Sequence, residues 1–104
     1  GNSFVHETES QVILNGSYNI NFTMDLVLKD TGLFNDLAKK LNSGLEISPK
    51  IVDIFKDGQK KYGSRAWSSM IVKRMEDSNN IDFRADGFPK ELTDNEPEEK
   101  GYEI

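Results

Sequence analysis

Cysteine is absent from this chain of 104 residues, and histidine occurs once, as His6. The lack of cysteine excludes disulfide bonds and thiolate metal ligands, and it agrees with a reducing compartment, so we expect a cytoplasmic protein. A single histidine has no second imidazole with which to hold a metal ion. We therefore expect His6 to be a surface residue and the chain to contain no metal site.

Apolar side chains are also scarce. They make up 36% of the residues without glycine, and the 8 glycines add about 8%, whereas globular domains usually have about 45–50% with glycine included. A short chain buries a small fraction of its surface, so a partner domain or a second subunit would compensate for the small core, and we expect a homo-oligomer. No apolar run approaches the roughly 20 residues that cross a bilayer, so we expect no membrane partner.

Motifs that bind phosphate groups are missing as well. The 8 glycines stand singly, so the chain has no G-x-G-x-x-G loop for a dinucleotide. The formal net charge is −5, and the excess of acids gathers in residues 81–104. Because no basic patch is available to neutralise a phosphate backbone, we expect no nucleic-acid partner.

What the chain does contain is helical periodicity, which predicts an all-α fold with about three helices. The first predicted helix spans residues 23–41, where leucines recur at helical spacing and form a broad apolar stripe. We expect Asn21 or Thr23 to cap its start and Gly44 to end it. Gly32, inside this helix, is expected to permit a close helix contact.

Two further helices are predicted from the residues that begin and end them. The second begins at Ser48 as the cap, with Pro49 in the first turn, and stops at Gly63. The third is capped by Ser64 and runs to about residues 75–76, before a cluster of turn-forming residues. Three amphipathic helices without a sheet pack on one another or on a neighbouring domain.

The flanks of these helices are predicted to be irregular. Residues 1–10 are polar and show no helix cap, and residues 17–22 alternate in a way that fits a strand but is too short to exclude a helix. Residues 1–80 are assigned to the helical domain. Residues 81–104 are predicted to form an acidic, extended and partly mobile tail, because their acids repel one another and their prolines break regular structure.

Phe22, Lys29 and Asp30 form the most informative local pattern. Phe22 and Lys29 are seven residues apart, so they project from about the same side of the first helix. Lys29 and Asp30 interrupt an apolar stretch, as charged residues at the rim of a pocket do. On spacing alone, however, the more common arrangement is a lysine on the solvated face and an aspartate that bridges to a neighbouring residue.

Residues 22–33, FTMDLVLKDTGL, resemble the F-x-x-x-L-x-x-K-D-x-x-L segment of β-hydroxyacid dehydrogenases, the 3-hydroxyisobutyrate dehydrogenase family. In that family the segment opens a helix of the C-terminal domain. The Ser48-Pro49 helix start, and Tyr62-Gly63 followed by Trp67-Ser68, are similar to later helices of the family. The resemblance spans nearly the whole chain, and its specificity rests mainly on the spacing of the phenylalanine and the lysine–aspartate pair.

The resemblance implies a helical C-terminal domain of the 6-phosphogluconate dehydrogenase-like type, with residues 1–80 as part of a substrate and dimerisation domain. It implies an NAD(P)-dependent oxidoreductase, similar to 3-hydroxyisobutyrate dehydrogenase or 2-hydroxy-3-oxopropionate reductase, that acts on a small 3-hydroxy acid or its semialdehyde. The NAD or NADP would be bound mainly by an N-terminal domain outside this chain. We therefore expect this chain to be a fragment without activity of its own.

Three residues acquire expected roles from the same resemblance. It implies that Lys29 approaches the cofactor, and that Phe22 and Asp30 border the substrate. No residue here matches the proton-transferring lysine of the family, so we expect no catalytic residue in this chain. The choice of hydroxy acid and of NAD or NADP depends on the other domain.

A non-enzymatic helical interaction module is the competing interpretation, since a low apolar content and an acidic tail suit it as well. In that case Phe55, Tyr62 and Trp67 would anchor a partner protein. A purely structural dimerisation domain is a third interpretation. It overlaps with the first, because the helical domain of the resembled family also forms the dimer.

Overall fold

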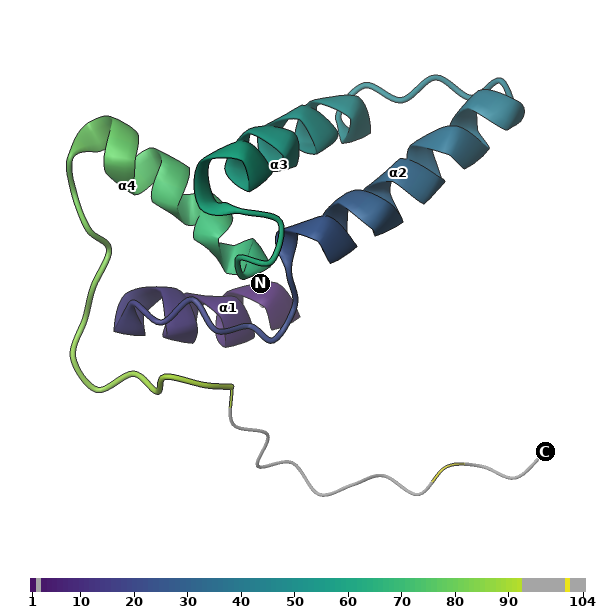
Figure 1. Ribbon diagram of the computed structural model, residues 1–104. Helices are drawn as coiled ribbons and strands as arrows, with labels where there is room; N and C mark the ends of the chain where they lie inside the picture. Colours follow the sequence, from purple (N-terminus) through teal and green to yellow (C-terminus); the bar gives the residue numbers. More distant parts are fainter. Residues whose placement is uncertain (2, 93–100, 102–104) are drawn as a thin grey trace.

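A computed structural model describes residues 1, 3–92 and 101 of the chain. This part of the protein is all-helical, as predicted, and contains no strand (Figure 1). The elements in chain order are α1 (Phe4–Asn15), α2 (Met24–Lys40), α3 (Ser48–Tyr62), the 3₁₀ helix η1 (Ser68–Val72) and α4 (Lys73–Asn79).

The helices divide into a hairpin and a base. Figure 1 shows α2 and α3 as a hairpin that extends to one side, while α1, η1 and α4 lie at its base. The helix α2 packs on α3, and η1 contacts both α3 and α1. Residues 80–92 run past α4 and along α1 without helical structure (Figure 1).

The helix α1 was not predicted, and the expectation of an irregular lead-in over residues 1–10 is wrong. Ser3 occupies the N-cap position, and its hydroxyl accepts a hydrogen bond from the amide of His6 at 3.3 Å. Gly16 ends the helix in the left-handed conformation, with φ of 90°. Only Val12 of this helix is buried, so its sequence lacks the apolar stripe by which a helix is recognised.

The helix α2 lies where its leucine spacing predicted. Thr23 is at the N-cap position, but its hydroxyl donates to the carboxylate of Asp25 instead of accepting from a backbone amide. The left-handed residue after the helix is Asn42, with φ of 55°, so the prediction that Gly44 ends the helix is wrong. A Cβ at Gly32 would meet no atom within 4 Å, so this glycine permits no close contact.

The first amides of α2 are bound by a segment from the other side of the hairpin. Such amides have no partner within their own helix. Here the amides of Met24 and Asp25 donate to the carbonyls of Ala66 (2.9 Å) and Ser64 (3.0 Å). This junction fixes the start of α2 against the loop that follows α3.

The same junction explains why the third predicted helix begins later than expected. The amide of Ser68 donates to the carbonyl of Phe22 at 2.7 Å, and residues 63–67 form a turn rather than a helix. The helical path starts only with η1 and continues as α4 to Asn79, one turn beyond the predicted end. The prediction that Ser64 caps a helix is therefore wrong, because tertiary hydrogen bonds use the backbone groups that a helix would need.

The helix α3 begins at Ser48 with Pro49 in its first turn and ends before Gly63, where φ is 101°. Its start and end agree with the prediction, but the cap does not. Ile47 occupies the N-cap position, and the hydroxyl of Ser48 donates to Oδ1 of Asn35 in α2 at 2.8 Å. This bond joins the two helices of the hairpin instead of capping one of them.

The predicted acidic tail lies only partly within the described residues. Residues 81–92 are irregular, with a turn at residues 86–87, and are bonded to α1 and the segment after it. The amide of Ala85 donates to Leu14 O (3.0 Å), and the Asn15 side chain donates to Phe88 O (2.8 Å). Residues 93–100 and 102–104 lie outside the described part of the chain.

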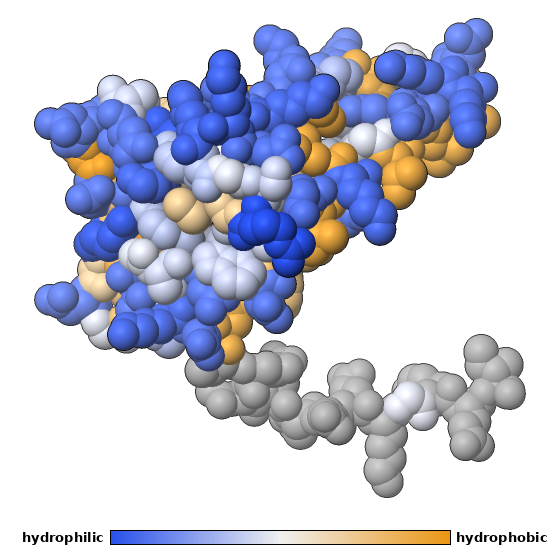
Figure 2. Space-filling model, viewed as in Figure 1, coloured by the Kyte–Doolittle hydropathy of each residue, from blue (hydrophilic) through white to orange (hydrophobic). Residues whose placement is uncertain are grey.

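The core is small. Within the described part of the chain, its buried hydrophobic residues are Val12, Tyr18, Met24 and Ala38. Gly58, in the middle of α3, is buried beside Met24 and Ile71, so this glycine is where α2, α3 and η1 approach one another closely. Apolar surface is instead visible along the outer edge of the α2–α3 hairpin (Figure 2).

Alanine at the two interior helix glycines is expected to have different effects on stability. Gly32→Ala should raise the free energy of unfolding by about 0.5–1 kcal/mol, because alanine favours the helix and its Cβ has open space. Gly58→Ala should not show this gain, because its Cβ would lie 2.8 Å from Cδ1 of Ile71, which would have to move away. Urea unfolding followed by circular dichroism measures both changes. Equal stabilisation by the two variants would contradict the packing at Gly58.

Candidate functional site

The exposed face of α2 is apolar over most of its length. Leu26, Leu33 and Leu37 lie on one side of the helix, and the latter two side chains are 61% and 54% exposed. The sequence predicted this stripe, but α3 covers the opposite side of α2, where Ala38 is buried. A row of exposed aliphatic residues on a helix is a surface that another chain or domain can cover.

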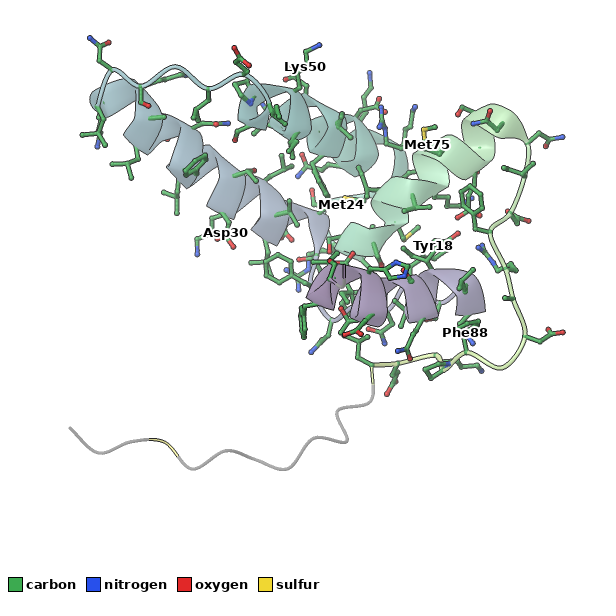
Figure 3. All side chains as sticks on the ribbon, turned by 180° about the vertical axis from the view of Figure 1, so that it is seen from behind. Tyr18, Met24, Asp30, Lys50, Met75 and Phe88 are labelled. Carbon is green, nitrogen blue, oxygen red and sulfur yellow. The ribbon has the colours of Figure 1, made fainter. Side chains whose placement is uncertain are left out.

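Asp30 lies within this apolar stripe. It is four residues after Leu26 and three before Leu33, and such spacings place all three on one helix face. Figure 3 shows Asp30 pointing away from the hairpin partner α3. Lys29 is adjacent in sequence, and both side chains are exposed. Among the described residues, neither side chain has a hydrogen-bond or ion-pair partner.

Phe22 is not in the same pocket as Lys29 and Asp30. It lies before α2 and lines a surface groove of about 570 Å³ at the junction between α2 and η1. The residues that line this groove are Asn19, Ile20, Asn21, Phe22, Trp67, Glu91 and Leu92. Phe22 lies before α2, so it does not share a helix face with Lys29 as its spacing predicted, and neither Lys29 nor Asp30 lines the groove at Phe22.

Backbone contacts hold the groove together from three segments. Asn19 forms an isolated parallel bridge with Glu91, and Thr23 forms an antiparallel one with Trp67. Asn21 has a left-handed backbone, with φ of 57°, a conformation that asparagine tolerates better than most residues. Residues 17–22 thus form neither the strand nor the helix that their alternation left open.

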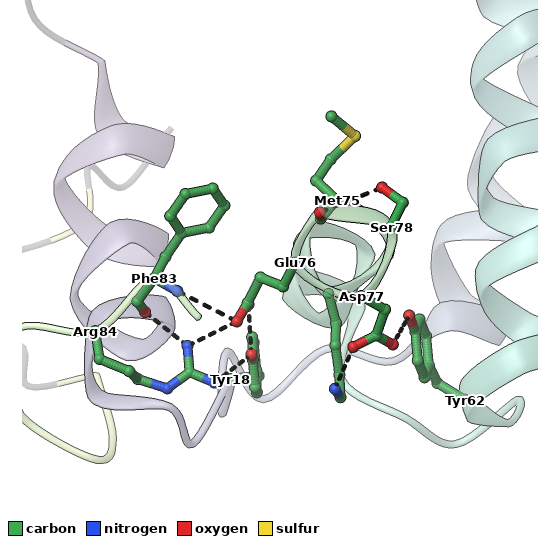
Figure 4. A network of polar contacts seen from close by, with 9 residues as sticks. Tyr18, Tyr62, Met75, Glu76, Asp77, Ser78, Phe83 and Arg84 are labelled. Atoms are coloured by element: carbon green, nitrogen blue, oxygen red, sulfur yellow. Dashed lines mark hydrogen bonds and ion pairs between the residues drawn. The ribbon is translucent and has the colours of Figure 1, made fainter. Parts of the chain in front are cut away.

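A buried carboxylate that the sequence did not indicate lies at the base of the molecule (Figure 4). Glu76 is 1% exposed. Its Oε1 accepts from the Tyr18 hydroxyl at 2.5 Å, and its Oε2 accepts from Nη1 of Arg84 at 3.1 Å and from the amide of Phe83 at 3.3 Å. Glu76 therefore has internal partners for both oxygens, which indicates a structural role rather than an acid or base for a substrate.

Tyr18 and Arg84 complete this cluster. Nη2 of Arg84 donates to the Tyr18 hydroxyl at 2.6 Å, and the guanidinium lies 5.1 Å from the centroid of the tyrosine ring. Burial raises the pKa of the Tyr18 hydroxyl, and the bond to Glu76 raises it further, whereas Arg84 acts in the opposite direction. The cluster joins the segment after α1, the helix α4 and the irregular residues 81–92.

A second polar cluster joins the end of α3 to α4. The Tyr62 hydroxyl donates to Asp77 at 2.7 Å, and Nζ of Lys73 pairs with the same carboxylate at 2.8 Å (Figure 4). Burial, and then the bond to Asp77, raises the pKa of Tyr62 to about 12, and Lys73 lowers the pKa of Asp77. Each charge here has an internal partner, so this cluster also supports the fold.

Two kinds of candidate residue are thus distinguished by their partners. Glu76→Gln is expected to lower the free energy of unfolding by about 1–3 kcal/mol, because it weakens the bonds of a buried acceptor. Lys29→Ala and Asp30→Ala are expected to change it by at most about 0.5 kcal/mol, because these exposed side chains have no internal partner. Urea unfolding of the three variants measures this contrast. A loss at Lys29 as large as that at Glu76 would show that Lys29 has a structural role.

Among residues 1, 3–92 and 101, no group of three or more histidine, aspartate or glutamate side chains is placed to hold a metal ion. Over the same residues, no helix is long and apolar enough to cross a membrane. Comparisons with protein-family models, with curated proteins and with solved structures found no match to this chain.

Proposed function

We propose that this chain supplies helical, cleft-forming structure to an NAD(P)-dependent dehydrogenase of small 3-hydroxy acids. The observation that carries the proposal is the pair Lys29 and Asp30, which lies without internal partners in an exposed apolar stripe. The resemblance of residues 22–33 to the corresponding dehydrogenase segment supports it as well, and it includes the same two residues. The finer expectation, a 6-phosphogluconate dehydrogenase-like domain, belongs to the same proposal.

Covering the α2 stripe would change the chemistry of the charged pair. Burial of Leu26, Leu33 and Leu37 against another domain would stabilise that contact by about 25 cal/mol per Å² of apolar area removed from water. Lys29 and Asp30 would then lose water as well, and electrostatic interactions strengthen where water is excluded. The pair would hold a bound group in a closed cleft more strongly than on an open surface.

Within that cleft, the residues of this chain would act by position and charge. The ammonium of Lys29 would hold an anionic or hydroxyl group of the cofactor or substrate, and Asp30 beside it would favour the charged form of the lysine. The NAD or NADP supplies the hydride chemistry when it is bound. A free ammonium fits such a cofactor, but the chain has no phosphate-binding loop, so its main binding site would be on another domain.

The apolar stripe also supports the alternative, a non-enzymatic interaction module. The anchors expected for it, Phe55, Tyr62 and Trp67, are only partly exposed, and the Tyr62 hydroxyl is bonded to Asp77. The more accessible apolar residues are Leu33 and Leu37. Both interpretations use the α2 face for contact with another polypeptide. They differ in whether the charged pair takes part in a reaction.

The α2 face is expected to bind a hydrophobic dye or to self-associate in the isolated chain. Leu33→Gln should reduce dye binding and association, because it removes apolar area from the centre of the stripe. The matched control is Val5→Gln, which changes a similarly exposed aliphatic residue on α1. Dye fluorescence and sedimentation velocity measure the two effects. A monomer that binds no dye, or an equal response to both substitutions, would contradict a contact role for α2.

Lys29 is expected to contribute to catalysis in the intact enzyme that carries this chain. Lys29→Ala should lower kcat/KM by the equivalent of about 2–4 kcal/mol, as removal of one preorganised electrostatic donor does. Asp30→Ala should act through Lys29, so the double variant should lose less than the sum of the single losses. The measurement is kcat/KM for oxidation of a 3-hydroxy acid, with folding checked by circular dichroism.

Lys39→Ala is the matched control, since Lys39 is an exposed lysine in the last turn of the same helix. A lysine there is explained by the helix dipole alone, so this substitution should leave kcat/KM unchanged. Equal and small effects at Lys29 and Lys39 would favour the interaction module over the enzyme.

A further inference from the structure

The groove beside Phe22 has a composition that is distinct from that of the α2 face. Two aromatic residues, Phe22 and Trp67, come from adjacent backbone segments, since the carbonyl of Phe22 accepts from the amide of Ser68. Asparagines and aliphatic residues complete most of the lining. The volume of about 570 Å³ is sufficient for a small organic molecule.

Only one lining residue is charged within the described part of the chain, and it is the acid Glu91. Aromatic rings present negative electrostatic potential at their faces and attract cations placed over them. The carboxylate of Glu91 in the lining likewise favours a positively charged ligand. An anionic ligand would meet Glu91 without a lysine or arginine in the lining to balance it.

We propose that this groove is a binding site for a small organic cation with an alkylated ammonium group. Phe22 and Trp67 would contact the methyl groups of the ligand, and Glu91 would supply the opposite charge. The proposal does not depend on the dehydrogenase function. The acid in the lining makes this groove a poor site for the carboxylate of a hydroxy acid, which Lys29 is better suited to attract.

The groove is held in shape before any ligand enters. The Ser69 hydroxyl donates to Tyr18 O at 2.5 Å, and the Ser17 hydroxyl donates to Lys90 O at 2.5 Å. These bonds fix the segments that precede Phe22, follow Trp67 and carry Glu91. A ligand therefore needs to order little of the protein, which reduces the entropic cost of binding.

The basic residues near the groove in sequence do not line it, so the charge of its lining stays negative. Arg65 lies close in sequence to Trp67, but its guanidinium pairs with Asp25 at 3.2 Å and does not line the groove. Lys90 precedes Glu91, and it is not among the lining residues either. The acid is thus not neutralised by a cation within the groove.

Three ligands of similar shape and different charge test the proposal. Choline is the cation, 3,3-dimethylbutan-1-ol is its neutral isostere, and 3,3-dimethylbutanoate is the anion. Trp67 is the only tryptophan of the chain, so its indole N–H gives one resonance in a ¹⁵N-labelled sample. Each ligand is titrated at constant ionic strength. Choline is expected to shift this resonance in a saturable way and to bind about threefold or more tightly than the alcohol, as cation–π contacts at exposed sites predict.

Substitutions then test which residues cause the preference for choline over the alcohol. Phe22→Leu and Glu91→Gln should each reduce the preference for choline over the alcohol. Glu46→Gln removes another exposed acid, which lies outside the groove, and should leave the preference unchanged. Equal binding of choline and the alcohol, tighter binding of the anion, no saturable shift, or equal effects of Glu91→Gln and Glu46→Gln would each overturn the proposal.

Discussion

Hydrogen bonds between the start of α2 and residues 64–68 are the constraint on which the rest of the structure depends. They supply partners for the amides of Met24 and Asp25, which the helix itself leaves unsatisfied. A buried amide without a partner costs about 1–3 kcal/mol, so these bonds favour one path of the chain after α3. The same bonds bring Phe22 beside Trp67, direct α2 along α3 and start the next helical segment at Ser68 rather than earlier.

Much of the remaining cohesion comes from polar clusters, because the apolar core is small. Glu76 binds Tyr18 and Arg84 in a buried cluster, and Asp77 binds Tyr62 and Lys73 in a more exposed one. A buried carboxylate is stable only when its oxygens have partners, and here Tyr18, from the segment after α1, and Phe83 and Arg84, from the segment after α4, provide them. Polar contacts between distant segments thus compensate for the scarcity of apolar residues in the sequence.

On the outer face of α2, by contrast, apolar residues are exposed to solvent and a charged pair lies between them. Leu33 and Leu37 would stabilise any contact that covers them, whereas Asp30 would be costly to bury without a partner. A surface of this kind selects its partner, since only one that satisfies Asp30 and Lys29 gains the full benefit of the leucines. This selectivity is what the proposed dehydrogenase cleft and the alternative interaction module have in common.

The sequence by itself determined the class of fold, the position of α2 and the bounds of α3, because leucine spacing, Pro49 and Gly63 act locally. It also marked Lys29 and Asp30 as neighbours on one helix. It missed α1, whose apolar stripe is weak, and Glu76, whose partners are distant in the chain. Only the tertiary structure decided that the stripe of α2 faces solvent and that residues 63–67 form a turn, because both depend on contacts between segments that local patterns do not encode.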